Sequence, residues 1–130
     1  MSASTAVVAF VCNWEGYRGL ETAAQSGLTI PASVKIVRVS CLSRVHSGLL
    51  LKAFELGAGG VIMVGCSDQH CHYGTEKEVV EHNLDKVRSI MSLLGLQPRQ
   101  LELCRISQNE GPELVSKLVE FNHQIKQLST

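Results

Sequence analysis

The cysteines are the residues of this sequence that could most directly carry out chemistry. The chain has five of them in 130 residues, an odd count that a simple disulfide framework does not explain. Cys12, Cys41, Cys66 and Cys71 lie beside polar residues typical of loops, whereas Cys104 lies inside an apolar run. Thiolates bind zinc and iron–sulfur clusters, and they also act as nucleophiles and redox groups. We therefore expect a chemical role for the first four cysteines and a packing role for Cys104.

Four short apolar runs predict the strands that must position these cysteines. The runs are Ala6–Val11, Val34–Val39, Gly60–Val64 and Leu101–Ile106. The first and third are almost wholly apolar, as in strands covered on both faces, and the second carries two cations that favour a place near a sheet edge. Apolar residues at helical spacing lie between the runs and predict helices over about 49–56, 80–94 and 112–128, with a weaker helix over 19–26.

This alternation of strands and helices predicts one α/β domain over residues 1–130. Right-handed crossovers between parallel strands place helices on both faces of the sheet. We expect a small doubly wound parallel sheet of four strands in the order 2-1-3-4. In such sheets, ligands bind beyond the carboxyl ends of the strands, where the strand order reverses.

Four cysteines fall at that edge of the predicted sheet. Cys12 directly follows the first predicted strand, and Cys41 and Cys66 each stand two residues beyond the next two. Cys71 lies five residues further along the third loop. Four converging thiolates predict a tetrahedral sulfur site that holds either zinc or an iron–sulfur cluster.

Charged and aromatic neighbours offer further functional groups. Arg18 and Arg44 are candidates to raise the reduction potential of an anionic cluster, because nearby cations stabilise its reduced form. His70 and His72 flank Cys71 and suggest a mixed cysteine–histidine site of zinc or Rieske type. We interpret both histidines as hydrogen-bonding or solvent-facing residues, because four cysteines already complete a ligand set.

A second interpretation makes Cys12 a nucleophile. The segment from Cys12 to Arg18 matches C-x5-R between a strand and a helix, and it resembles the phosphate loop of low-molecular-weight tyrosine phosphatases and thioredoxin-linked arsenate reductases. Glu15 counts against this reading because it would place a carboxylate beside the bound anion, and Gly19 stands where a Ser or Thr is expected. The chain also has no Asp-Pro pair to serve as general acid. A nucleophilic enzyme and a structural zinc protein remain the alternatives.

Overall composition excludes other classes of function. The 12 basic and 12 acidic residues give zero formal net charge, so nucleic acid is not the expected partner. No apolar run reaches the roughly 18–20 residues of a membrane span. The first apolar run has no basic residue before it, which argues against a secretory signal and for a cytoplasmic location, where thiols stay reduced.

Six sequence segments between about residues 7 and 121 give a more specific indication of the protein family than the cysteine spacing alone. They read VAFVCNWEGY at 8–17, RVSCLSRV at 38–45, LKAFELGAGGVIMVGCSDQHCHY at 51–73, LLGLQPRQLEL at 93–103, ISQNEG at 106–111 and VEF at 119–121. Together they resemble the delta subunit of methyl-viologen-reducing hydrogenase, a family of small iron–sulfur proteins.

The resemblance implies a non-catalytic electron-transfer subunit. Family members carry one 2Fe–2S cluster and relay electrons from a hydrogenase or formate dehydrogenase to a heterodisulfide-reductase-like flavoprotein, often in an electron-bifurcating complex. Carried over by position, the implied cluster ligands are Cys12, Cys41, Cys66 and Cys71.

The sequence departs from the family pattern near the first cysteine. Members typically read C-N-W-C, whereas Glu15 stands at the position of the second cysteine here. Either that cysteine is not a ligand and four thiolates still complete the site, or the cluster is altered or absent, with Glu15 as an oxygen ligand. We favour the first interpretation because all four remaining cysteines fall at one sheet edge. Arg105 also stands where an aromatic residue is common.

Overall fold

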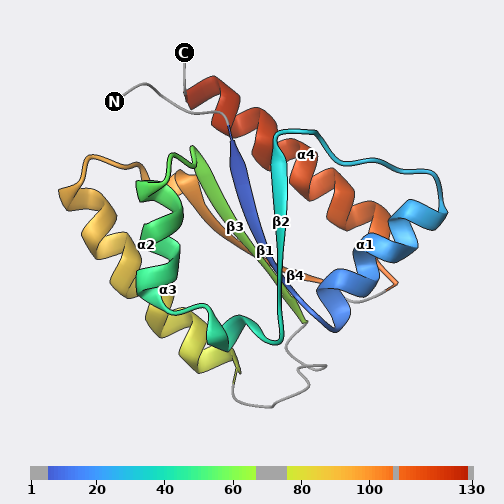
Figure 1. Cartoon of the computed structure of the whole chain (residues 1–130), viewed down its shortest axis with the longest axis horizontal. Helices are drawn as coiled ribbons and strands as arrows, with labels where there is room; N and C mark the ends of the chain where they lie inside the picture. Colours follow the sequence, from blue (N-terminus) through green and yellow to red (C-terminus); the bar gives the residue numbers. More distant parts are fainter. Residues whose placement is uncertain (1–5, 67–75, 107–108, 129–130) are drawn as a thin grey trace.

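A computed structural model gives the fold and describes residues 6–66, 76–106 and 109–128 (Figure 1). Strands and helices alternate along the chain, as predicted. The elements are β1 (Val7–Cys12), α1 (Glu15–Gln25), β2 (Val34–Val39), the 3-10 turn η1 (Leu42–Arg44), α2 (Ser47–Glu55), β3 (Gly60–Cys66), α3 (Glu76–Leu93), the 3-10 turn η2 (Pro98–Gln100), β4 (Leu101–Ile106) and α4 (Gly111–Leu128).

The strands form one parallel sheet in the order β2-β1-β3-β4, which confirms the predicted topology. In the register of this sheet, Val11 of β1 lies beside Arg38 of β2 and Val64 of β3. Because all strands run the same way, their carboxyl ends meet at one edge. Helices α2 and α3 cover one face of the sheet, and α1 and α4 cover the other (Figure 1).

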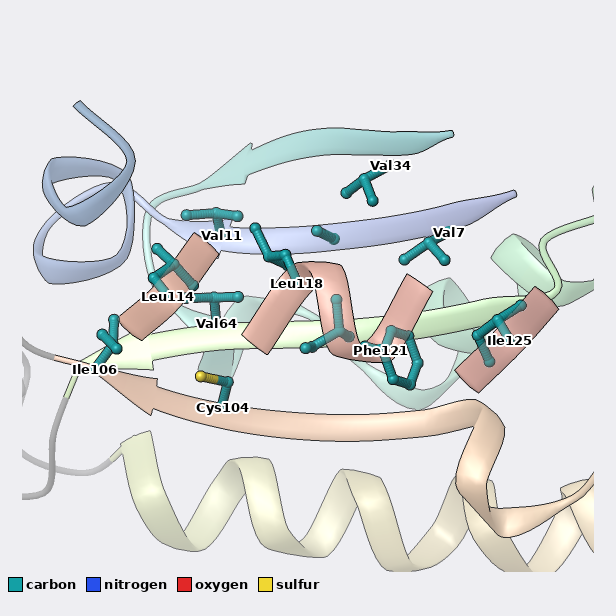
Figure 2. Close-up of a cluster of buried hydrophobic side chains, with 12 residues drawn as sticks. Val7, Val11, Val34, Val64, Cys104, Ile106, Leu114, Leu118, Phe121 and Ile125 are labelled. Carbon is teal, nitrogen blue, oxygen red and sulfur yellow. The ribbon is translucent and has the colours of Figure 1, made fainter. Parts of the chain in front are cut away.

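Each face of the sheet has its own apolar core. Alternate side chains of the two central strands point to opposite faces, so these strands are buried on both sides. Toward α1 and α4, the core contains Val7, Val11, Val34, Val64, Leu114, Leu118, Phe121 and Ile125 (Figure 2). Toward α2 and α3, it contains Phe10, Leu42, Leu50, Phe54, Met63, Val80, Leu84, Val87 and Met91. Exposed Lys35, Val37 and Arg38 confirm that β2 lies at the edge.

Two predicted boundaries near the carboxyl edge were wrong. Helix α1 begins at Glu15, four residues before the predicted start, because the chain turns into the helix almost directly after β1. Strand β3 continues to Cys66, which was predicted to lie two residues beyond it. The extension arises because β4 continues alongside, so that Cys66 pairs with Ile106. The stop predicted for α3 is confirmed, since Gly95 follows the helix with a φ of +79°.

Candidate metal centre

Three of the four predicted ligand positions have backbones at the carboxyl edge of the sheet. Cys12 ends β1 and pairs with Val39 of β2, and Cys41 follows Val39 by two residues. Cys66 ends β3 on the other side of β1. Neighbouring strands lie about 4.8 Å apart and rise about 3.3 Å per residue, so a one-residue offset leaves the Cys12 and Cys66 backbones roughly 6 Å apart. The predicted convergence of these strand ends is therefore confirmed for the backbone.

The Cys12 side chain is buried and accepts a hydrogen bond from α1. It is 2% exposed, and the backbone N–H of Gly16 donates to its Sγ at 3.2 Å. Gly16 is the second residue of the helix, where backbone N–H groups have no partner within the helix itself. The positive end of the helix dipole therefore faces the Cys12 sulfur.

Gly16 permits this approach because it has no β carbon. A β carbon at this position would lie 3.0 Å from Val11 Cγ1, 3.0 Å from the Val64 carbonyl oxygen and 3.2 Å from Cys12 Sγ. The carbonyl oxygen belongs to a central strand and has little freedom to move. A larger residue would push the first turn of α1 away from the cysteine.

Cys41 is the second buried thiol of the site. Its side chain is 5% exposed and stands directly before η1. The Ser43 hydroxyl donates a hydrogen bond to Cys41 Sγ at 3.2 Å. Cys12 and Cys41 thus both accept a hydrogen bond at sulfur, which stabilises negative charge on a metal-bound sulfur.

The residue after Cys41 anchors this loop to the sheet. Leu42 is fully buried, and its Cδ1 lies where a β carbon of Gly65 would otherwise be. Gly65 directly precedes Cys66 in β3. The contact holds the backbone of the Cys41 loop close to the end of β3.

The remaining predicted ligands follow the end of β3. Cys71, His70 and His72 lie outside the described residues, as does the side chain of Cys66. Within ranges 6–66, 76–106 and 109–128, no three His, Cys, Asp or Glu side chains form a group able to hold a metal ion. Two buried, hydrogen-bonded thiols at one edge fit the donor chemistry of a thiolate-bound centre. The complete four-cysteine set stays a prediction.

Arg38 is a residue of this region that was not predicted from the sequence. Its guanidinium carbon lies 3.7 Å from the centre of the Tyr17 ring, and its Nε donates to Asn13 Oδ1. Arg18 and Arg44 were expected to be the cations of the site, and both of these side chains are exposed on helical turns. The sequence indicated that Arg38 lies on an edge strand, but its register beside Val11 of β1 comes from the structure.

The backbone conformation weighs against a phosphatase-type loop at Cys12. Only Asn13 and Trp14 separate β1 from α1, and the Arg18 N–H already donates to the Trp14 carbonyl in the first turn. Most of the C-x5-R segment is therefore helix, in which the Arg18 N–H donates along the helix and the Gly16 N–H donates to Cys12 Sγ rather than to a bound anion. The exposed Arg18 side chain extends from that helix.

Cys104 has the packing role predicted for it. It lies in β4 among the apolar side chains that face α4 (Figure 2). Burial is the largest influence on this thiol and raises its pKa, which opposes ionisation. A neutral, buried thiol is a poor metal ligand.

Comparison with known proteins shows the family to which this sequence belongs. The family model of the methyl-viologen-reducing hydrogenase delta subunit matches residues 7–129, so the chain belongs to this family.

Relatives of two kinds share the sequence. The chain is 31% identical over 122 residues to the iron-sulfur subunit of the F420-non-reducing hydrogenase of Archaeoglobus profundus, covering 94% of this chain and 89% of the relative. The corresponding vhu iron-sulfur subunit of Methanopyrus kandleri is 30% identical over 128 residues, covering 98% and 97%. A subunit of the ferredoxin:CoB-CoM heterodisulfide reductase of Methanosarcina mazei is 30% identical over 122 residues, which are 94% of this chain and 15% of that protein. The chain therefore spans only a small part of the heterodisulfide reductase relative.

The helices do not meet the requirements of a membrane span. In the part of the chain that the structure describes, each helix is too short or too polar to cross a bilayer.

Proposed function

We propose that this chain is an electron-transfer subunit that holds a 2Fe–2S cluster through Cys12, Cys41, Cys66 and Cys71. The observation that supports this most strongly is the arrangement at the carboxyl edge of the sheet. There the buried thiols of Cys12 and Cys41 each accept a hydrogen bond, and the β3 strand ends beside them at Cys66. A bound 2Fe–2S cluster supplies one-electron chemistry.

The residues around the thiols prepare the site for that role. The Gly16 N–H and the Ser43 hydroxyl stabilise negative charge on the Cys12 and Cys41 sulfurs, which raises the reduction potential of a cluster bound there. Burial of both thiols limits the access of water. Strand ends and the Leu42 anchor keep the sulfurs in place, so little reorganisation accompanies electron transfer.

We also propose that Glu15 does not replace a ligand. The cysteine found at this position in typical family members is dispensable in this proposal, because four other cysteines supply a complete thiolate set. Glu15 is the first residue of α1, and the N–H of the next residue, Gly16, donates a hydrogen bond to Cys12 Sγ.

The two kinds of relatives support a position between two partners. Similar sequences occur as a separate hydrogenase subunit and as a small part of a longer heterodisulfide reductase chain. A unit that occurs both alone and within a longer chain is suited to dock on that longer chain. We propose that electrons come from a hydrogenase or formate dehydrogenase and pass to a heterodisulfide-reductase-like flavoprotein, within an electron-bifurcating complex in the cytoplasm.

Analysis of the purified protein tests the cofactor directly. Protein purified without oxygen should contain about two iron and two sulfide ions per chain, absorb visible light and give an EPR signal after reduction with dithionite. A colourless protein free of iron contradicts the proposal. Zinc without sulfide identifies a structural zinc protein instead, and phosphatase or arsenate reductase turnover that disappears in Cys12→Ser identifies a nucleophilic enzyme.

Binding to a flavoprotein tests the proposed partner. The chain should co-purify with a heterodisulfide-reductase-like flavoprotein from its own cells. After its own cluster has been reduced with dithionite, the chain should reduce the flavin of that protein. If the cluster of the chain is reduced but the flavin of the bound flavoprotein stays oxidised, the proposed relay is wrong.

A further inference from the structure

Arg38 connects the edge strand to the turn that directly follows Cys12. From β2 it reaches across the end of β1, where its Nε donates to Asn13 Oδ1. Its guanidinium stacks on the Tyr17 ring of α1 at 3.7 Å from the ring centre. One side chain therefore holds both ends of the Asn13–Tyr17 segment.

The segment between these two contacts contains the hydrogen-bond donor to Cys12. Gly16 lies between Asn13 and Tyr17, and its N–H donates to Cys12 Sγ at 3.2 Å. As a first-turn amide, it has no acceptor in the helix, so the sulfur is its natural partner. Trp14, at the N-cap position, provides no side-chain cap to this helix. The Arg18 N–H closes the first turn on the Trp14 carbonyl, and Arg38 adds two contacts from outside the helix, to Asn13 and to Tyr17.

We propose that Arg38 is a positioning residue, which holds the Gly16 N–H against the Cys12 sulfur by fixing the Asn13–Tyr17 segment and thereby raises the reduction potential of the bound centre. The effect on potential rests on the proposed function, whereas the effect on the Gly16 hydrogen bond does not. Arg38 is exposed, so solvent and salt weaken the direct influence of its charge on a buried sulfur. Its geometric effect on the turn is not screened in this way.

Hydrogen exchange in the metal-free full-length chain tests the positioning step by itself. The Gly16 amide should exchange at least about fivefold faster in Arg38→Met than in the wild type, because its hydrogen bond opens more often. Asn13→Ala and Tyr17→Leu each remove one contact and should also accelerate the exchange. Tyr17→Phe keeps the aromatic ring, and Lys35→Met removes a different cation from β2, the strand of Arg38. In both variants the Gly16 amide should exchange at the wild-type rate.

Amides in the middle of β3, such as that of Val64, provide an internal reference for folding. Their exchange should be equal in all variants, which separates a local opening of the turn from general instability. If Arg38→Met unfolds the chain, Asn13→Ala and Tyr17→Leu still decide the question. A Gly16 amide that exchanges at the wild-type rate in these folded variants overturns the proposal.

Redox titration of the cluster-loaded protein tests the consequence for electron transfer. The midpoint potential should fall in Arg38→Met, and also in Asn13→Ala and Tyr17→Leu, which do not change the charge. If only Arg38→Met lowers the potential, the charge acts directly and the positioning role is wrong. If the wild type binds no cluster but the exchange result holds, the proposed function fails while the role of Arg38 in the turn stands.

Discussion

Leu42 occupies the space beside Gly65 so completely that a β carbon at Gly65 would overlap Leu42 Cδ1. Leu42 follows Cys41 in the chain, and Gly65 precedes Cys66. The contact therefore couples two segments that carry proposed ligands. Glycine is needed here for close approach, since the sheet backbone cannot move away without disturbing its neighbours.

Gly65→Ala should therefore destabilise the protein and displace the Cys41 loop. We expect the free energy of unfolding to fall by about 1–3 kcal/mol, the usual cost of inserting a methyl group into a packed core. Gly48→Ala is the matched control, because a β carbon there would approach only the His46 side chain, at 3.2 Å, and no atom of the sheet. Urea unfolding measures both variants.

A double-mutant cycle shows whether Leu42 is the cause. Leu42→Ala alone should cost about 2–5 kcal/mol because it leaves a cavity. Combined with Gly65→Ala, it should cost less than the sum by about 1 kcal/mol or more, since the new methyl group enters the space that Leu42 vacates. Simple additivity of the two changes would contradict the direct contact.

The four proposed ligands should be distinguishable from the packing cysteine by iron content. Cys12→Ser and Cys41→Ser should lose most of the iron and sulfide, because serine is a much poorer ligand for an iron–sulfur cluster. Cys66→Ser and Cys71→Ser should behave in the same way. Cys104→Ala is the control and should retain full iron content, since this side chain packs among apolar residues facing α4. Visible absorption and iron analysis after anaerobic purification measure the result, and retention of a normal cluster in Cys12→Ser rules out the proposed ligand set.

Much of this fold could be predicted because its strands are continuous apolar runs. Val7–Val11 and Gly60–Val64 are buried on both faces, and nothing in their sequence competes with the strand conformation. The cations Lys35 and Arg38 marked β2 as an edge strand, which left little choice in the strand order. The convergence of Cys12 and Cys41 then follows from parallel topology alone.

The details that tune the site were not predictable in the same way. The Gly16 donor depends on where α1 begins, and two glycines in its first turns weaken the local helix signal. The contact of Ser43 with Cys41 depends on the direction of its side chain, and the contacts of Arg38 depend on the register of β2 with β1. Hydrophobic patterns determine neither. Cys66 was misplaced because pairing with β4, a partner distant in sequence, extends β3 beyond its apolar run.

Ser43 should influence the reduction potential without affecting cluster assembly. Its hydroxyl donates to Cys41 Sγ, so Ser43→Ala removes one donor from a proposed ligand. If this hydrogen bond stabilises the reduced cluster by about 1 kcal/mol, its loss should lower the midpoint potential of a one-electron couple by about 40 mV. Ser43→Thr keeps the hydroxyl and should stay close to the wild type. EPR-monitored redox titration measures the shift, and an unchanged potential in Ser43→Ala would show that the bond is absent from the loaded protein.

The buried Cys104 thiol should make stability depend on alkaline pH. Burial raises the pKa of Cys104 above its ordinary value of 9.0, while the nearby Lys117 ammonium lowers it and the Glu102 and Glu110 carboxylates raise it. A pKa that is higher in the folded state means that the unfolded chain releases the proton first. The stability from this thiol is therefore complete below pH 9 and declines as the pH rises through the folded-state pKa.

The Lys117 ammonium contributes in the same direction. Its pKa is raised above 10.5, chiefly by the hydrogen bond to Glu102, whose Oε1 lies 2.9 Å from Lys117 Nζ. This contribution is present below pH 10.5 and is lost at higher pH. Between pH 9 and 10.5, the decline that the two groups produce should therefore come mainly from Cys104.

Urea unfolding of metal-free, fully reduced protein between pH 7 and 10.5 checks this dependence. The wild type should lose more stability across that range than Cys104→Ala, in which the buried ionisable group is missing. Lys117→Met should retain the Cys104-dependent decline, because it leaves the thiol buried among its apolar neighbours. Parallel pH profiles for the wild type and Cys104→Ala would show that the thiol ionises equally easily in the folded and unfolded states, contrary to its burial.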